Sequence, residues 1–366
     1  MPCDSVTCPE LNELLPADPG PVMALPAAPD VVWVVDRSAS MAQAIEPQSQ
    51  CPENCGINGR GCPLTCATRW ASVRRALEGV LNETASTARH AMLIFPSDGQ
   101  CSSTPRFNVA PADVDDETTR LQRVDDAKRQ LTLKGPFGGS PQAEALGFIA
   151  GVEALRGEER EHLVVLVTDG LPNCNERNPN TCAVPEACRC TSLTCGGSTC
   201  ATGCLDDAAT MAAMTALRAS GQQLVMLGVG GDLAASETQL VFTRLAITGG
   251  ARRACTTDSA CGPNGRCVVA ERLCASPTWW LKTAADADVI AQHFTARIAE
   301  SSRCRYVLQP HPSVTSATRP LLNVFIDGAP YRLGNGWAYE SEAVIRLTGR
   351  LCASALAGAD VTVSLP

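Results

Sequence analysis

The stretch that decides the fold is DVVWVVDRSAS, residues 30–40. Its first part, DVVWVVD, is a short continuous apolar run between two carboxylates, which is typical of a strand buried on both faces. Its second part, DRSAS, places the carboxylate of Asp36 and the hydroxyls of Ser38 and Ser40 at the end of that strand. Oxygen-bearing side chains at this position predict an α/β sheet with a ligand site beyond the carboxyl ends of its strands.

The chain beyond this stretch alternates between apolar runs and segments with helical spacing of apolar residues. The further predicted strands are HAMLIF from His90, EHLVVLVTDG from Glu161, QQLVMLGVG from Gln222 and PTWWLKTA from Pro277. The predicted helices are 68–85, 117–133, 140–155, 205–221, 236–250 and 286–300. In the third of these, Ser140 is expected to cap the helix and Pro141 to take its first position. This order predicts a doubly wound, mostly parallel sheet with helices on both faces.

Changes of composition divide the chain into three predicted parts. Residues 1–29 are Pro-rich, contain two cysteines and are expected to form an N-terminal tether. Residues 30–303 are the α/β domain, interrupted by cysteine-rich insertions at 41–67, 171–204 and 255–274. After Cys304 the apolar pattern changes to period two, in RYVLQ, LNVFIDG, EAVIRLTG and VTVSL, which predicts a small antiparallel β domain over 304–366.

Charge and composition exclude several classes of function. The 366 residues carry a net charge of 30 − 38 = −8, which argues against nucleic acid or an anionic membrane as a partner. No uncharged run is long and apolar enough to predict a transmembrane helix. The four histidines are far apart in the sequence, so a histidine-rich metal centre is not expected.

The 20 cysteines allow two interpretations, disulfides outside the cytosol or thiolate metal sites inside it. Because the chain contains no C-x2-C pair, with which structural zinc sites usually begin, the disulfide interpretation is favoured. Cys304 and Cys352 stand alone in the last domain and are predicted to pair. Disulfides imply an extracytoplasmic location, yet the first residues lack the basic and apolar regions of a signal peptide. We therefore expect that a signal peptide is missing from this sequence.

Five oxygen-bearing side chains are predicted to meet at the carboxyl edge of the sheet. They are Asp36, Ser38 and Ser40 after the first strand, Ser140 in the PFGGSPQ loop, and Asp169 after the strand from Glu161. A set with oxygen donors alone suits a hard divalent cation. Taken singly, each of these residues is commonly a helix cap or turn former, and only their joint pattern indicates a metal site.

Three motifs in this order, DRSAS at 36–40, GGSP at 138–141 and TDG at 168–170, resemble the metal-ion-dependent adhesion site of von Willebrand factor type A (vWA) domains. The resemblance covers roughly residues 30–300. It implies that Ser38, Ser40 and Ser140 ligate the metal directly, and that Asp36 and Asp169 act directly or through water. Ala39 stands where the family usually has Gly and Ser140 where it usually has Thr, and both departures keep the donor oxygens. In their cysteine-rich composition, the insertions are similar to those of secreted, disulfide-rich bacterial members of this family.

The function that follows is a metal-dependent, adhesion-type binding module of a secreted or cell-surface protein. We expect Mg²⁺, with Ca²⁺ or Mn²⁺ as alternatives, and a partner that donates a carboxylate to an open metal position. Segments 41–67, 97–113 and 171–204 should form a rim around the site. The alternative is a structural component of an envelope assembly whose metal site is vestigial or only stabilises the fold. An enzyme is not expected, because no histidine, nucleophile elbow or phosphate loop accompanies these motifs; the oligomeric state stays open.

Overall fold

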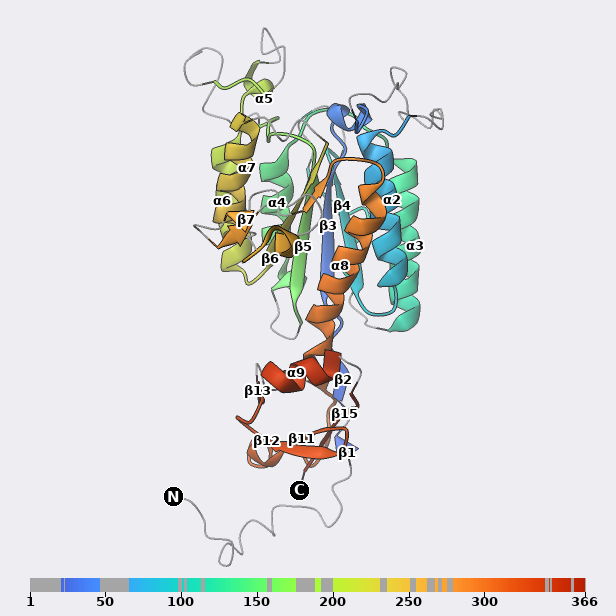
Figure 1. The fold of residues 1–366 in the computed structure, drawn as a ribbon, viewed down its shortest axis with the longest axis vertical. Helices are drawn as coiled ribbons and strands as arrows, with labels where there is room; N and C mark the ends of the chain where they lie inside the picture. Colours follow the sequence, from blue (N-terminus) through green and yellow to red (C-terminus); the bar gives the residue numbers. More distant parts are fainter. Residues whose placement is uncertain are drawn as a thin grey trace, which may run out of the picture. The chain divides into compact units, whose positions relative to one another are not determined.

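The structure of the chain is a computed structural model (Figure 1). It describes residues 21–22, 24–46, 66–97, 101, 104–112, 116–156, 160–175, 188–191, 200–230, 236–250, 255–261, 267–268, 272–274, 279–339, 342, 344–356 and 359–365. The chain forms two compact units. An α/β unit comprises Pro29–Gly157 and His162–Ile298, and a β unit comprises the described residues of Met1–Ala28, Glu158–Glu161 and Ala299–Pro366.

The α/β unit is built on one parallel sheet of five strands, in the order β4-β3-β5-β6-β9. The strands are β3 (Asp30–Asp36), β4 (Arg89–Phe95), β5 (His162–Thr168), β6 (Gln223–Val229) and β9 (Trp279–Leu281). Each pairing is parallel, and β3 lies between β4 and β5 with every residue buried. The predicted doubly wound sheet is confirmed.

Six helices in the described part of the chain cover the two faces of this sheet. They are α2 (Arg69–Glu83), α3 (Glu117–Leu133), α4 (Gln142–Ala150), α6 (Asp207–Ala219), α7 (Ser236–Thr248) and α8 (Asp286–Arg303). Helices α2, α3 and α8 pack on one face, in a core that includes Trp33, and α4, α6 and α7 pack on the other, in a core that includes Val34 (Figure 1). Successive residues of a strand point to opposite faces, so β3 supplies both cores. None of the described helices combines the length and apolar character that a membrane crossing requires.

The chain order places a topological switch point between β3 and β5. From β3 the chain crosses to β4 on one side, and it later returns to β5 on the other side. The loops that leave the carboxyl ends of β3 and β5 therefore diverge, which opens a crevice between them. This crevice lies directly beyond Asp36 and Asp169.

Short elements complete the α/β unit. They are the 3₁₀ turns η1 (Ala39–Ala42), η3 (Glu153–Leu155) and η6 (Asp258–Cys261), the one-turn helix α5 (Cys200–Gly203), and the hairpin of β7 (Cys267–Val268) with β8 (Leu273–Cys274). The helix predicted over 140–155 is shorter in the structure, because α4 ends at Ala150 and a 3₁₀ turn follows. Helix α8 runs on to Arg303 rather than ending at Glu300.

The β unit consists of two antiparallel four-stranded sheets, in the orders β1-β15-β11-β12 and β13-β14-β10-β2. Its elements are β1 (Pro21–Val22), β2 (Ala24–Pro26), β10 (Arg305–Leu308), η7 (Arg319–Leu321), β11 (Asn323–Ile326), β12 (Ala329–Arg332), β13 (Trp337–Tyr339), β14 (Val344–Leu347), α9 (Gly349–Leu356) and β15 (Val361–Ser364). Strands β10 and β11 alternate between buried and half-buried residues, as period two predicts.

Two strands of the β unit come from the segment predicted as a tether. β1 pairs with β15, β2 pairs with β10, and Val22 is buried in the core of the unit. Both are edge strands, where a proline that lacks an N–H removes no ladder hydrogen bond. The Pro-rich composition that suggested a tether is thus compatible with strand structure over 21–26; residues 1–20 lie outside the described residues.

The cysteines whose sulfur atoms the structure describes are disulfide-bonded. The pairs with both partners among the described residues are Cys101–Cys174, Cys188–Cys204, Cys255–Cys267 and Cys304–Cys352. The predicted Cys304–Cys352 bond is therefore confirmed. Although the sulfurs of Cys255, Cys261 and Cys267 lie within 4.8 Å of one another, all three are disulfide-bonded. They offer no thiolates to a metal, and the zinc alternative has no support at this cluster.

The aromatic core of the α/β unit should contribute strongly to stability. Phe294 of α8 is fully buried, with its ring centroid 5.7 Å from that of Trp33 and 5.2 Å from that of Trp279. We predict that Phe294→Ala lowers the free energy of unfolding by about 3–5 kcal/mol, because it leaves a cavity between helix and sheet. Leu133→Ala, at a site that is 69% exposed, is the matched control. Equal effects of the two changes in urea denaturation would contradict this assignment of the core.

Candidate metal centre

The first loop of the site begins where β3 ends. Asp36 is fully buried, and its Oδ1 accepts a hydrogen bond of 2.7 Å from the backbone N–H of Ser38. The chain then turns into η1, which brings the hydroxyls of Ser38 and Ser40 to 3.0 Å from each other. One strand end and one short turn thus place three of the five predicted site residues together.

The loop before α4 is joined to this first loop by two backbone hydrogen bonds. Ala39 N–H donates to the carbonyl of Gly138 (2.8 Å), and Phe137 N–H donates to the carbonyl of Arg37 (2.5 Å). Gly138 has a φ of +75°, a conformation that glycine adopts without strain. The two loops run together and deliver Ser140 to the end of β3.

Ser140 does not cap α4, and the predicted cap was wrong. Helix α4 begins at Gln142 with Pro141 in the N-cap position, and the cap makes no side-chain hydrogen bond. The Ser140 hydroxyl instead donates to Asp36 Oδ2 over 2.7 Å. This hydrogen bond joins residues 104 positions apart in the chain. Because the Ser140 hydroxyl donates to Asp36, it does not cap the N-terminus of α4.

The third loop leaves β5 and carries Asp169. The two carboxylate oxygens of Asp169 accept from different partners, Oδ1 from the Ser40 hydroxyl (2.9 Å) and Oδ2 from the Arg69 guanidinium (2.7 Å). The structure therefore brings all five predicted site residues into one cluster. Hydrogen bonds connect Ser38 to Ser40 and Ser40 to Asp169. Asp36 accepts hydrogen bonds from the Ser140 hydroxyl and the Ser38 backbone N–H.

The cluster holds more negative than positive charge. Burial raises the pKa of Asp36 to about 6, and the nearby charge of Asp169 adds to the rise while hydrogen bonds from Ser140 and Thr168 oppose it. Burial also raises the pKa of Asp169, against the opposing effect of Arg69. Two buried carboxylates beside one guanidinium leave a surplus of one negative charge. A divalent cation fits such a site, because it would offset this charge and accept the oxygen donors.

Sequence analysis missed four residues that support the cluster. Thr168 donates to Asp36 Oδ2 (2.6 Å), and Gln142 Nε2 lies 3.1 Å from both Ser140 Oγ and Thr168 Oγ1. Asn173 accepts from the Ser140 backbone N–H (2.8 Å), and Arg69 pairs with Asp169. Thr168 stands next to Asp169 in the motif and could have been suspected. Arg69 lies 100 positions from its partner, so no local signal marks it.

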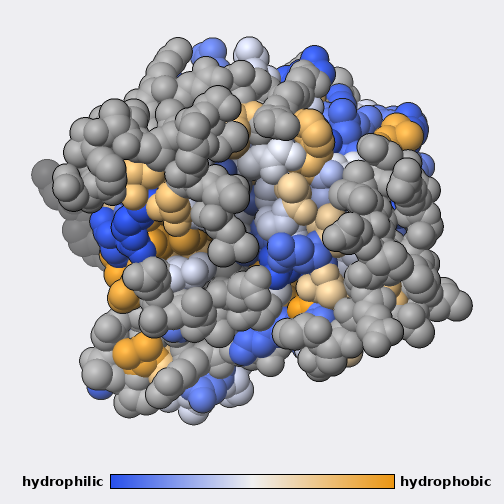
Figure 2. Space-filling model, turned by 90° about the horizontal axis from the view of Figure 1, so that it is seen from above, coloured by the Kyte–Doolittle hydropathy of each residue, from blue (hydrophilic) through white to orange (hydrophobic). Residues whose placement is uncertain are grey.

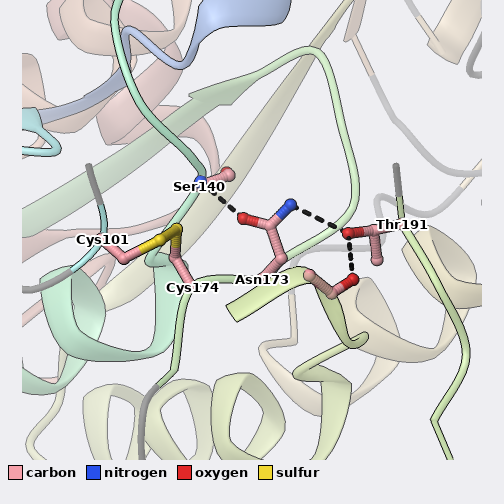
Figure 3. The surroundings of a disulfide bond; sticks show 6 residues. Cys101, Ser140, Asn173, Cys174 and Thr191 are labelled. Atoms are coloured by element: carbon pink, nitrogen blue, oxygen red, sulfur yellow. Dashed lines mark hydrogen bonds between the residues drawn. A yellow bond between two sulfur atoms is a disulfide. The ribbon is translucent and has the colours of Figure 1, made fainter. Parts of the chain in front are cut away.

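A disulfide lies beside the Ser140 loop, as Figure 3 shows. Cys101, from the segment after β4, bonds Cys174, from the segment after β5. The side chain of Asn173 lies between Ser140 and Thr191, and it also donates to the Thr191 hydroxyl (2.9 Å). A Cβ at Gly139 would collide with the Cys174 sulfur, so the close approach of loop and disulfide requires glycine there.

The cluster opens into a cavity of about 800 Å³. Figure 2 views this end of the molecule from above and shows hydrophilic and hydrophobic residues side by side where the surface is hollowed. Its wall includes Gln43, Cys101, Thr191 and Thr202, which belong to the three segments predicted to form a rim. Most of 41–67 and much of 171–204 lie outside the described residues. Residues 104–112 of the predicted segment 97–113 are described and are not among the residues that line the cavity.

Arg37, the second residue of the DRSAS motif, ties the loops around the cluster together. Its guanidinium donates to the backbone carbonyls of Pro96 (2.7 Å), Gly135 (3.0 Å) and Ser97 (3.3 Å). Two of these carbonyls follow β4 and one precedes the Ser140 loop. Arg37 therefore acts on the site as a positioning residue, because it fixes the segment that delivers Ser140.

We predict that Arg37→Met lowers the free energy of unfolding by about 2 kcal/mol, since it leaves three carbonyls without their charged donor. Metal affinity should fall as well, because the segment that leads to Ser140 loses the hydrogen bond between Arg37 and the Gly135 carbonyl. Arg129→Met is the control, since this arginine is 58% exposed and makes an i,i+3 ion pair on α3. Chemical denaturation and a Mn²⁺ titration check both effects. Equal behaviour of the two variants would argue against this role.

The raised pKa of Asp36 makes the stability of the metal-free protein depend on pH. Because the folded state holds this proton more tightly than the unfolded state, the contribution is full below about pH 4 and lost as the pH rises through about 6. In EDTA, the wild type should lose on the order of 3 kcal/mol relative to Asp36→Asn as the pH rises from about 3 to about 7. Urea denaturation at several pH values measures this difference. A difference independent of pH would contradict the burial of an ionisable Asp36.

Comparisons with known proteins find distant likenesses among solved structures. No family model matches the sequence, and no curated protein matches it. Three similar solved structures are the manganese-loaded TRAP protein of Plasmodium vivax, the PilB minor pilin of Streptococcus sanguinis and the pilus adhesin SpaC of Lactobacillus rhamnosus GG in an open conformation.

These three likenesses are distant. TRAP has 15% identity and a TM-score of 0.35 over 60% of this chain, and PilB has 14% and 0.42 over 75%. SpaC has 13% identity and a TM-score of 0.45 over 94% of this chain. The matched parts span 65%, 61% and 39% of those chains respectively. What these proteins bind is accordingly not transferred to this chain.

Proposed function

We propose that this chain is a metal-dependent binding module of the vWA type, with an adhesion-type site. One observation carries the proposal: five oxygen-bearing side chains from three separate loops, all buried except the half-buried Ser40, converge in one cluster with surplus negative charge. Ser38, Ser40 and Ser140 would hold the ion directly, and Asp36 and Asp169 directly or through water. Mg²⁺ suits such a set because it retains water readily, and Ca²⁺ or Mn²⁺ are the alternatives.

The cation would supply an open position for a group of the partner. The five side chains do not form a closed cage, and the ion they hold would face the cavity of about 800 Å³. A carboxylate of the partner is the natural occupant, because it is a hard anionic oxygen ligand. The cavity wall around the site is formed by loops, which is the usual place for residues that set specificity.

We also propose that the protein works outside the cytosol. Its described cysteines are disulfide-bonded, and such bonds persist in oxidising compartments. The disulfide Cys101–Cys174 joins two loops of the site, so reducing conditions would loosen the loops around the proposed ion.

Asp36→Ala should abolish binding of divalent cations, because it removes the carboxylate that orders Ser38, Ser140 and Thr168. The matched control is Asp125→Ala, which removes a carboxylate that is 65% exposed on α3 and should leave the affinity unchanged. Titration of EDTA-treated protein with Mn²⁺, followed by electron paramagnetic resonance of the free ion, measures both. Retained Mn²⁺ affinity in Asp36→Ala would overturn the proposal.

A further inference from the structure

Arg69 is a buried cation at the edge of the proposed metal site. It is the first residue of α2, its side chain is 5% exposed, and its Nη1 lies 2.7 Å from Asp169 Oδ2. The other oxygen of the same carboxylate accepts from Ser40, one of the proposed ligands. The carboxylate of Asp169 therefore lies between the permanent positive charge of Arg69 and the hydroxyl of Ser40.

The surrounding structure is shaped to hold this guanidinium. The backbone N–H of Arg69 donates to the carbonyl of Gln43, in the segment that follows η1. Gly230, after β6, has a φ of +85°, and a Cβ there would come within 2.7 Å of Arg69 Nε. The Gly230 carbonyl is itself held by the indole N–H of Trp280 (2.7 Å). Space for the guanidinium thus depends on a glycine that is fixed in position.

The charges around the cavity give Arg69 a consequence for the ligand. Among the described residues that line the cavity, Arg69 and Asp169 are the charged ones, and Asp36 lies buried beside them. With both carboxylates ionised, the site carries −2 + 1 = −1 without a metal and +1 with a divalent ion. If Arg69 were neutral, these values would be −2 and 0. The guanidinium should weaken attraction of the metal and leave the loaded site positive.

We propose that Arg69 is a specificity-determining residue: it lowers affinity for the divalent cation and makes the loaded site select an anionic ligand over a neutral one of the same shape. This inference rests on the proposed function, since it needs a metal in the cluster. A purely structural ion pair makes a different prediction, because its loss would loosen the Asp169 loop and weaken metal and anion binding together.

The experiment separates these two roles by the sign of the effects. Arg69→Gln and Arg69→Met both remove the charge, Arg69→Lys keeps it, and Arg75→Met removes a charge on the same helix that is 63% exposed. Mn²⁺ affinity is measured first. Water-proton relaxation of the Mn²⁺-loaded protein then follows displacement of metal-bound water by acetate, with neutral acetamide as the matched probe. Near-ultraviolet circular dichroism reports whether each loaded variant is folded.

We expect both charge-removing variants to bind Mn²⁺ at least about tenfold more tightly and acetate at least about tenfold more weakly than the wild type. Acetamide binding and the Arg75→Met variant should stay within about twofold of the wild type. Arg69→Lys, which keeps the charge, should change the Mn²⁺ and acetate affinities less than Arg69→Met does. Weaker binding of both Mn²⁺ and acetate in the Gln and Met variants, or no change in either, would overturn the role of Arg69. No Mn²⁺ binding by the wild type would refute the proposed function itself, and this inference with it.

Discussion

The structure depends on one costly arrangement, the burial of two carboxylates side by side at the carboxyl edge of a parallel sheet. Asp36 and Asp169 are withdrawn from water, and each raises the electrostatic cost of ionising the other. The chain compensates with hydroxyl donors from Ser40, Ser140 and Thr168, the backbone N–H of Ser38 and the guanidinium of Arg69. Because one guanidinium offsets only one of the two carboxylate charges, one negative charge remains, and a bound cation would balance it.

The remainder of the fold keeps this arrangement in place. The switch point between β3 and β5 brings the two strand ends together, and the cores on both faces of the sheet fix the strands. Backbone bonds join the first loop to the Ser140 loop, Arg37 ties both to the end of β4, and the Cys101–Cys174 disulfide joins the segments after β4 and β5. The disulfide framework therefore has a local role near the site, beside what it indicates about the compartment.

Local patterns predicted the scaffold and the ligand candidates, because both are written in short stretches of chain. Strand β3 follows from a continuous apolar run, and helix α3 was predicted with its observed bounds from Glu117 to Leu133. The failures involve partners that are distant in sequence. Ser140 was correctly grouped with the site, but it was also expected to cap its own helix, whereas its hydroxyl donates to Asp36. Strands β1 and β2 were missed in Pro-rich sequence, because only their pairing with β15 and β10 makes them strands. Arg69 and Asn173 gain their importance entirely from tertiary contacts.

The central claim is that these buried oxygens form a cation site, and anomalous X-ray diffraction from crystals grown with Mn²⁺ at neutral pH tests it most directly. The account predicts a strong anomalous peak in contact with the hydroxyls of Ser38, Ser40 and Ser140, beside Asp36 and Asp169. It also predicts no comparable peak at the disulfide-bonded cysteines Cys255, Cys261 and Cys267. A cluster without a peak at Mn²⁺ concentrations that saturate ordinary divalent sites, or a peak located elsewhere in the protein, would contradict it.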